Sequence, residues 1–242
     1  MGEVIVIASG KDGVGKTVLA ANLGAVLAQN NHSVVLMDLN FGSRNLDIYL
    51  GLENRIIYDL VDVVTGICRI KQALVRDRRF ANLFLISAPQ SRQKASISAE
   101  QLKALCHELK KVFDFIIIDA PAGNDGGLSL AISAADRAVV VTVPEYAAIR
   151  DTEIISDLLE SKGIMNRSVV INKIIPELHQ SGLVPDPEEI AETLRLPIAG
   201  LIAYDQNIHI STNMGVPIAA VQGSYIARNL NEIGIRILSK SL

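Results

Sequence analysis

The chain has 242 residues, 49% of them hydrophobic, and its formal net charge at pH 7 is -3. A chain of this length and composition can bury a sizeable core, and its nearly balanced charge gives no global field toward nucleic acid or an anionic membrane. No apolar run approaches the roughly 20 residues of a membrane-spanning helix, which excludes the integral membrane class.

The cysteines and the N-terminal segment indicate a cytoplasmic protein. Cys68 and Cys106 have no CxxC or CxxH neighbour, unlike the cysteines of a zinc site or a disulfide framework. We expect both to be small core residues. The segment EVIVIAS, residues 3–9, has no charged leader before a longer apolar stretch, so we expect no signal peptide.

Short apolar runs rich in Val and Ile recur along the chain. In order they are VIVIA (4–8), SVVLMD (33–38), NLFLIS (82–87), DFIIIDAP (114–121), RAVVVTVP (137–144), SVVINK (168–173) and PIAGLIA (197–203). Runs that are apolar on both faces are typical of parallel strands covered by helices on each side. We therefore predict that these runs form the strands of one parallel sheet.

Helical patterns alternate with these runs. The clearest cover residues 16–30, 98–112 and 146–163, and Ser98 with Gln101 predicts a capping box at the second of them. The alternation predicts a single α/β domain over residues 1–242, with a doubly wound, mostly parallel sheet and helices on both faces. Residues 177–189, ELHQSGLVPDPEE, are the expected mobile loop.

A phosphate-binding loop follows the first predicted strand. Residues 10–17 satisfy G-x-x-x-x-G-K-[ST] and consist of Gly10, Lys11, Asp12, Gly13, Val14, Gly15, Lys16 and Thr17. The glycines let backbone N–H groups face the phosphates, and the helix N-terminus adds its positive dipole end. We expect Lys16 to reach the β- and γ-phosphates and Thr17 to ligate Mg²⁺. The alternative, a glycine turn without function, does not require this strand-loop-helix context.

The run FIIIDAP supplies the second half of a nucleotide site. It ends in Asp119, where a carboxylate can hold Mg²⁺ through its water shell. The base is predicted to be adenine, because Asn172-Lys173-Ile174-Ile175 has Ile where guanine-selective proteins need the Asp of N-K-x-D. Asn172 can hydrogen-bond an adenine edge or be a strand-end turn residue.

Several motifs together resemble one family. Lys11 stands five positions before Lys16, where deviant Walker A ATPases carry a signature lysine. The segments MDLNFGSRNLDIYLGLENRIIYDLVDVVTG (37–66), PEYAAIRDTEII (144–155) and GLIAYDQNIHISTNMGVPI (200–218) are similar to those of the septum-site MinD proteins within the MinD/ParA family. The resemblance extends over nearly the whole chain.

The resemblance implies an ATP-driven switch. Two protomers enclose two ATP molecules, each Lys11 reaches the partner's phosphates, and hydrolysis separates the homodimer. A cation supplied by the partner completes the charge clamp only in the dimer. The resemblance also implies that Asp38 orders the magnesium waters and that a regulatory protein binds the dimer. It places Arg150 with two interface candidates, Glu145 and Asp151, although both acids suit solvated positions at a helix start.

Three residues depart from the family pattern. Asp12 replaces a usual Gly, and a carboxylate beside bound phosphates repels them by about 1 to 4 kcal/mol unless Lys11, the partner's lysine or Arg44 offsets it. Asn40 replaces an Asp that positions or activates the attacking water, and an amide can orient water without accepting its proton. Val18 replaces a common Thr near the α-phosphate and leaves Thr17 intact.

Three interpretations of Asp12 and Asn40 stay open. Asp12 takes over the polar role of the missing acid, or the site hydrolyses ATP slowly and gives a long-lived dimer. In the third, Asp12 points to solvent and Asn40 is a neutral change. The predicted catalytic residues are thus Lys11, Asp12, Lys16 and Asn40, and the predicted nucleotide contacts are residues 10, 11, 13–18 and 172.

The C-terminal segment predicts a core helix. Its apolar stripe consists of Ile226, Leu230, Ile233 and Ile237. Such a stripe packs most simply against the sheet. Its basic residues, Arg228, Arg236 and Lys240, are too few to support the membrane-targeting helix with which MinD proteins generally end. Peripheral recruitment to the inner face of the membrane is therefore unsupported by this tail, and no nucleic acid partner is expected.

Four function classes compete on this sequence. A MinD-type ATPase that places the division site leads. Partition ATPases of the same family call for a basic DNA-binding surface that the composition does not indicate. A flagellar-placement regulator is equally close in sequence. A non-hydrolysing, ATP-locked adaptor is favoured by Asp12 and Asn40.

Overall fold

The computed structural model describes residues 1–41, 43–90, 97–123 and 126–239. Its strands are β1 (Glu3–Ala8), β2 (Val34–Asp38), β3 (Val75–Arg76), β4 (Leu83–Ile86), β5 (Phe115–Asp119), β6 (Arg137–Thr142), β7 (Arg167–Ile174) and β8 (Ile198–Ala203). The seven strands predicted from apolar runs are all present. The two-residue strand β3 has no apolar run of its own, which is why the pattern did not reveal it.

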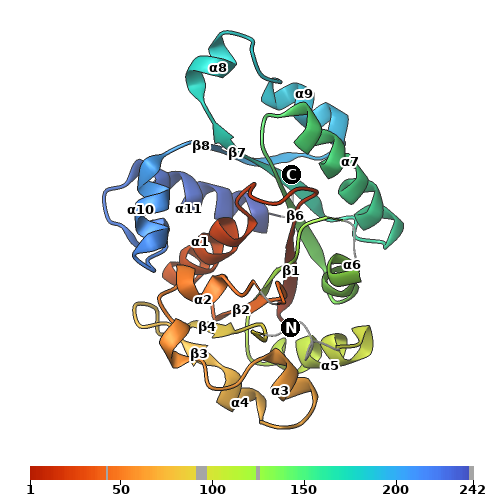
Figure 1. Ribbon diagram of the computed structural model, residues 1–242, viewed down its shortest axis with the longest axis vertical. Helices are drawn as coiled ribbons and strands as arrows, with labels where there is room; N and C mark the ends of the chain where they lie inside the picture. The colour runs from red at the N-terminus through yellow and green to blue at the C-terminus, as the bar shows by residue number, and fades with distance from the viewer. Residues whose placement is uncertain (42, 91–96, 124–125, 240–242) are drawn as a thin grey trace.

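The strands form one sheet in the order β3-β4-β2-β5-β1-β6-β7-β8 (Figure 1). Every neighbouring pair is parallel except β3 with β4. The predicted doubly wound, mostly parallel α/β fold is confirmed. Chain order reverses around β1, so the carboxyl ends of β1, β2 and β5 meet at one edge, where such sheets bind ligands.

The helices that follow the predicted patterns begin and end close to the expected residues. They are α1 (Lys16–Gln29), α5 (Ala99–Leu109) and α7 (Tyr146–Ser161). The capping box of Ser98 and Gln101 is present at α5. The remaining α-helices are α2 (Leu46–Tyr49), α3 (Leu60–Val64), α4 (Ile70–Ala73), α6 (Gly126–Ser133), α8 (Pro176–Gln180), α9 (Pro187–Leu194), α10 (Gln206–Asn213) and α11 (Tyr225–Leu238).

The core lies on both faces of the sheet. Alternate residues of β1 point to opposite sides: Ile5 and Ile7 pack with α1 and α11, whereas Val4 and Val6 pack with α5, α6 and α7. Since both sets are buried, β1 is apolar along its whole length. This two-sided burial holds the loop after β1 on a rigid support.

The prediction of a loop over residues 177–189 is partly wrong. Helix α8 and the start of α9 lie within it, and a proline occupies the first turn of each. Asp186 caps α9 through its side chain. Proline at the first helical position is pre-set to a helical φ, so residues that suggest a turn can instead start a helix.

The predicted burial of the C-terminal stripe and of the cysteines is confirmed. Ile226, Leu230, Ile233 and Ile237 are all buried. Cys68 and Cys106 are buried and free, and Lys240 lies outside the described residues. Among the helices in the described part of the chain, none is long and apolar enough to cross a membrane.

We predict that Gly200→Ala destabilises the fold. A Cβ at Gly200 would lie 2.2 Å from Cγ1 and 3.2 Å from Cβ of Ile233, a stiff β-branched residue on α11. Overpacking of this kind costs about 1 to 3 kcal/mol, and thermal unfolding should therefore shift downward by several degrees. Gly126→Ala is the control, because a Cβ there meets nothing within 4 Å. Equal melting temperatures for the two variants would contradict the prediction.

Candidate nucleotide-binding site

The phosphate-binding loop joins β1 to α1 at the carboxyl edge of the sheet. Gly13 and Gly15 have φ angles of 77° and 104°, which side chains rarely adopt. Gly15 is the N-cap of α1 and offers no side chain to the first N–H groups of the helix. These N–H groups are therefore available to an anion, as the motif predicted.

Lys16 is held inside this loop. It is buried, and its Nζ donates to Oγ of Ser9 at 2.9 Å, while that hydroxyl donates to the carbonyl of Lys11 at 2.8 Å. Burial lowers the pKa of Lys16, against the attraction of Asp119 and Asp12. An unneutralised ammonium placed in this way is suited to a polyphosphate.

The three predicted magnesium residues come together from three elements. Thr17 donates through Oγ1 to Oδ2 of Asp119 at 2.7 Å. Asp38 and Asp119 are directly paired across β2 and β5. The second oxygen of Asp119, Oδ1, is buried without a hydrogen-bond partner. A hydroxyl and two carboxylates with an orphaned oxygen fit the hard oxygen ligands of Mg²⁺.

Burial makes this carboxylate pair unfavourable in its charged form. It raises the pKa of Asp119 to about 8, with the neighbouring Asp38 adding to the effect. It also raises the pKa of Asp38 to about 6, against hydrogen bonds from Asn40 and Leu46. The site thus concentrates negative charge that a divalent cation would offset.

Asn40 lies between the two carboxylates. Its Nδ2 donates to Oδ2 of Asp119 at 3.0 Å, and its backbone N–H donates to Oδ1 of Asp38 at 2.8 Å. The other oxygen of Asp38 accepts the N–H of Leu46 at 3.3 Å. Asp38 therefore fixes both ends of the connection between β2 and α2. The sequence gave no signal for this arrangement, because it depends on an amide and a carboxylate 79 residues apart.

The structure puts Asp12 at the rim of the site, on an exposed part of the loop. Lys11 does not approach it and instead pairs with Glu145 at 2.7 Å. Arg44 pairs with Asp47 at 2.7 Å. The cation whose charge Asp12 interacts with is Lys16. Within one protomer, the predicted offset by Lys11 or Arg44 is therefore replaced by an interaction with Lys16.

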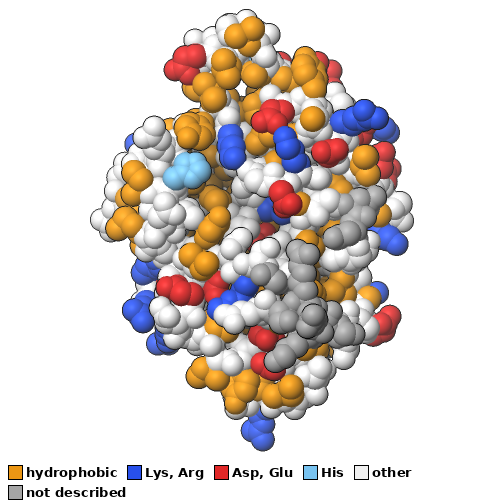
Figure 2. Space-filling view, in the orientation of Figure 1, with side chains coloured by type: hydrophobic (Ala, Val, Ile, Leu, Met, Phe, Trp, Pro, Cys, Tyr) orange, Lys and Arg blue, Asp and Glu red, His pale blue; other side chains and the backbone are white. Residues whose placement is uncertain are grey.

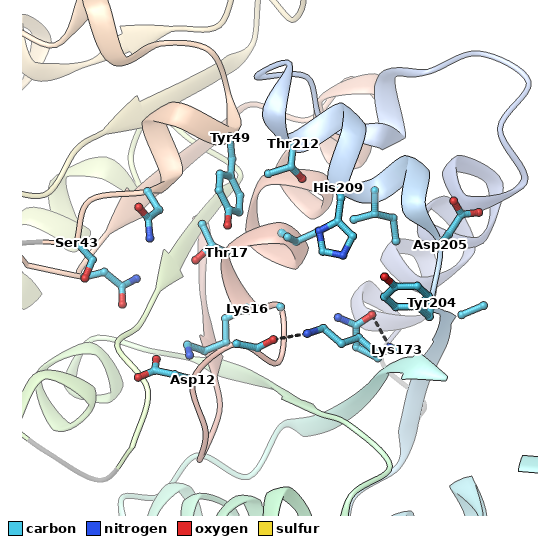
Figure 3. Close-up of a pocket in the computed structure, with 18 residues that line it drawn as sticks. Asp12, Lys16, Thr17, Ser43, Tyr49, Lys173, Tyr204, Asp205, His209 and Thr212 are labelled. Atoms are coloured by element: carbon cyan, nitrogen blue, oxygen red, sulfur yellow. Dashed lines mark hydrogen bonds between the residues drawn. The ribbon is translucent and has the colours of Figure 1, made fainter. Parts of the chain in front are cut away.

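A cavity of about 300 Å³ opens above the loop. Figure 3 shows Asp12, Lys16 and Ser43 toward one end and Tyr204, Asp205 and Lys173 toward the other. Helix α10 contributes one face to the wall, made of Ile208, His209 and Thr212. The rings of Tyr204 and His209 lie 5.9 Å apart. These residues were missed from the sequence, since nothing in their spacing marks them as close to a loop some 190 positions earlier.

The predicted nucleotide contacts divide between the cavity and the core. Val18 lines the cavity, whereas Val14 is buried and offers its backbone. Asn172 donates through Nδ2 to the carbonyl of Val14 at 2.8 Å and accepts the N–H of Lys173 at 2.9 Å. Lys173 in turn donates to the carbonyl of Gly13 at 2.7 Å. Asn172 thereby supports the loop, and its contact with adenine stays a prediction.

The interface candidates lie where α7 begins. Glu145 is the N-cap of α7 and carries the partner of Lys11. The backbone of Asp151 lies against the loop, because a Cβ on Gly10 would stand 2.4 Å from it. Arg150 is exposed. On the face shown in Figure 2, Lys and Arg side chains are interspersed with Asp and Glu rather than gathered into one area.

Comparison with known proteins agrees with this geometry. Residues 5–218 match the CobQ/CobB/MinD/ParA nucleotide binding domain. The septum site-determining protein MinD of Bacillus subtilis is 46% identical over 244 residues, covering 100% of this chain and 91% of that protein. The chain belongs to the MinD family.

Solved structures of this family have the same fold. The MinC:MinD complex of Aquifex aeolicus superposes with a TM-score of 0.92 at 37% identity, covering 100% of this chain and 97% of that one. MinD of Pyrococcus horikoshii, solved with Mg-ADP, has a TM-score of 0.89 at 26% identity over 99% of this chain and 97% of that one. The family resemblance and the fold expected from it are therefore confirmed.

We predict that Gly15→Ala weakens Mg-ADP binding at least tenfold. A Cβ at this position would stand 2.3 Å from Nδ2 of Asn172, which would push that amide off Val14 and distort the loop. Losing about 1.4 kcal/mol of binding free energy accounts for a tenfold effect. Isothermal titration calorimetry measures it directly.

Gly163→Ala serves as the control for backbone strain. Gly163 also has a positive φ, 81°, but a Cβ there meets nothing within 4 Å. It should lower the melting temperature and leave nucleotide affinity unchanged. If Gly15→Ala binds Mg-ADP as tightly as the unaltered chain, the support of the loop by Asn172 is not needed for binding.

Proposed function

We propose that this chain is an ATP-dependent dimerising switch that positions the site of cell division. The observation that carries the proposal is the position of Lys11. It lies beside a complete phosphate loop and is 44% exposed, while Lys16 is buried within the loop. One lysine therefore serves the nucleotide of its own protomer, and the other is available to a second protomer.

The residues of one protomer divide the work on Mg-ATP. Lys16 and the N–H groups of the loop hold the phosphates, and Thr17, Asp38 and Asp119 hold Mg²⁺ directly or through its waters. The ion neutralises phosphate charge as it develops. Lys11 of a second protomer adds a further positive charge at the same phosphates, so that hydrolysis requires the dimer.

A regulatory partner and the membrane enter this proposal through the relatives. The Aquifex aeolicus MinD structure is a complex with MinC, which supports a protein partner for this chain. Recruitment of the dimer to the membrane belongs to the same proposal. The exposed residues at the start of α7, next to the ion pair of Lys11, are suited to a partner that distinguishes monomer from dimer.

A second candidate function is an ATP-locked adaptor that hydrolyses little. It is favoured by Asn40, whose amide donates to Asp119 at 3.0 Å and cannot accept a proton from water. Asp12, whose nearest charge partner is Lys16, does not reach that position through any hydrogen bond in the described residues. The two candidates share the dimer and differ in its lifetime.

Light scattering after a limited dose of Mg-ATP separates the two candidates. We expect the molar mass to double and then return to that of the monomer as ATP is consumed, whereas Mg-ADP leaves it unchanged. A phosphate assay on the same sample follows hydrolysis. A dimer that persists for hours without phosphate release would support the adaptor, and no dimer at all would contradict both.

We predict that Glu145→Gln strengthens the ATP dimer about two- to fivefold. Lys11 must leave Glu145 before it can reach a partner, and an exposed ion pair contributes up to about 1 kcal/mol. The dimer dissociation constant with Mg-ATP, from sedimentation, measures the change. Asp157→Asn on the exposed side of α7 is the control for charge and should have no effect. A weaker dimer would instead make Glu145 an interface residue.

A further inference from the structure

The buried carboxylates of the magnesium site are joined by one side chain, that of Asn40. Its amide donates to Oδ2 of Asp119 at 3.0 Å and lies 3.4 Å from the backbone carbonyl of the same residue. Its N–H donates to Asp38 at 2.8 Å. We propose that Asn40 is a positioning residue that closes the connection between β2 and α2 over the magnesium site when no nucleotide is bound.

The physical reason is the charge of the carboxylate pair. Asp38 and Asp119 have no exposed surface and are paired directly on adjacent strands. A third carboxylate at position 40 would be repelled by both unless a cation lay between them. An amide in the same place donates to one acid with its side chain and to the other with its backbone. The nucleotide-free site is thus stable with Asn40 and frustrated with Asp.

The same contact obstructs the metal site. Oδ2 of Asp119 accepts hydrogen bonds from Thr17 and from Asn40. A cation at this oxygen requires both donors to turn away, and the amide nitrogen of Asn40 cannot itself serve as a ligand. Entry of Mg²⁺ therefore opens the connection that Asp38 fixes at Asn40 and Leu46. This inference goes beyond the ATPase proposal and rests on its magnesium site.

The first test is thermal unfolding of the full chain in EDTA without nucleotide. Asn40→Ala should lower the melting temperature by about 4 °C or more, because a buried acceptor loses its donor. Asn40→Asp should lower it further. Asn45→Asp is the matched control, since Asn45 lies on the same connection, is exposed and makes no cap hydrogen bond. It should melt within about 1 °C of the unaltered chain.

The second test is the affinity for Mg²⁺ alone, measured from the rise in melting temperature with MgCl₂. Asn40→Ala should bind Mg²⁺ more tightly than the unaltered chain, and Asn40→Asp at least tenfold more tightly. A merely structural role would lower the melting temperature and leave this affinity unchanged or weaker. Either that result, or an unchanged melting temperature for Asn40→Ala in EDTA, would overturn the proposal.

These measurements are independent of the proposed function. Neither ATP hydrolysis nor dimerisation enters them, so a chain that fails to dimerise with ATP can still show the effects of Asn40. Conversely, a normal ATP-driven dimer combined with unaltered Asn40→Ala unfolding would reject only the role of Asn40.

Discussion

Two carboxylates buried side by side at the ends of neighbouring strands constrain the rest of the site. Asp38 and Asp119 are paired in the sheet and have no exposed surface, so burial raises the pKa of both. What surrounds them is a set of donors: the hydroxyl of Thr17, the amide of Asn40 and backbone N–H groups. The loop and its helix stand beside this pair because β1 is the neighbour of β5.

The fold was predictable because each strand reports its own environment. Strands covered on both faces must be apolar at every position, and seven of the eight have such a run. The phosphate loop was predictable for a similar reason, since glycine is required where φ is positive, as at Gly13 and Gly15. The helices α8 and α9 were not, because their prolines and short length match a turn as well as a helix start.

The far end of the cavity could not be predicted from the sequence. Tyr204 and His209 reach it only because β8 lies at the edge of the sheet and α10 folds back toward α1 (Figure 1). The roles of Asn172 and Asn40 were hidden for the same reason. Both were singled out as ligands of nucleotide or water, and in the structure each amide also bonds to the protein itself, one to Val14 and the other to Asp119.

The nucleotide-free protomer therefore keeps its charged groups satisfied in two ways that ATP must undo. Lys11 is paired with Glu145 on the surface, a contact that solvent screens and that costs little to break. Asn40 is bonded to Asp119 in the interior, where losing a donor costs more unless a cation replaces it. Magnesium can replace the second contact, and the phosphates facing a partner can replace the first. Since the interior contact is the stronger one, release of Asn40 sets the order of events: the metal site opens within one protomer before the lysine of a second protomer completes it.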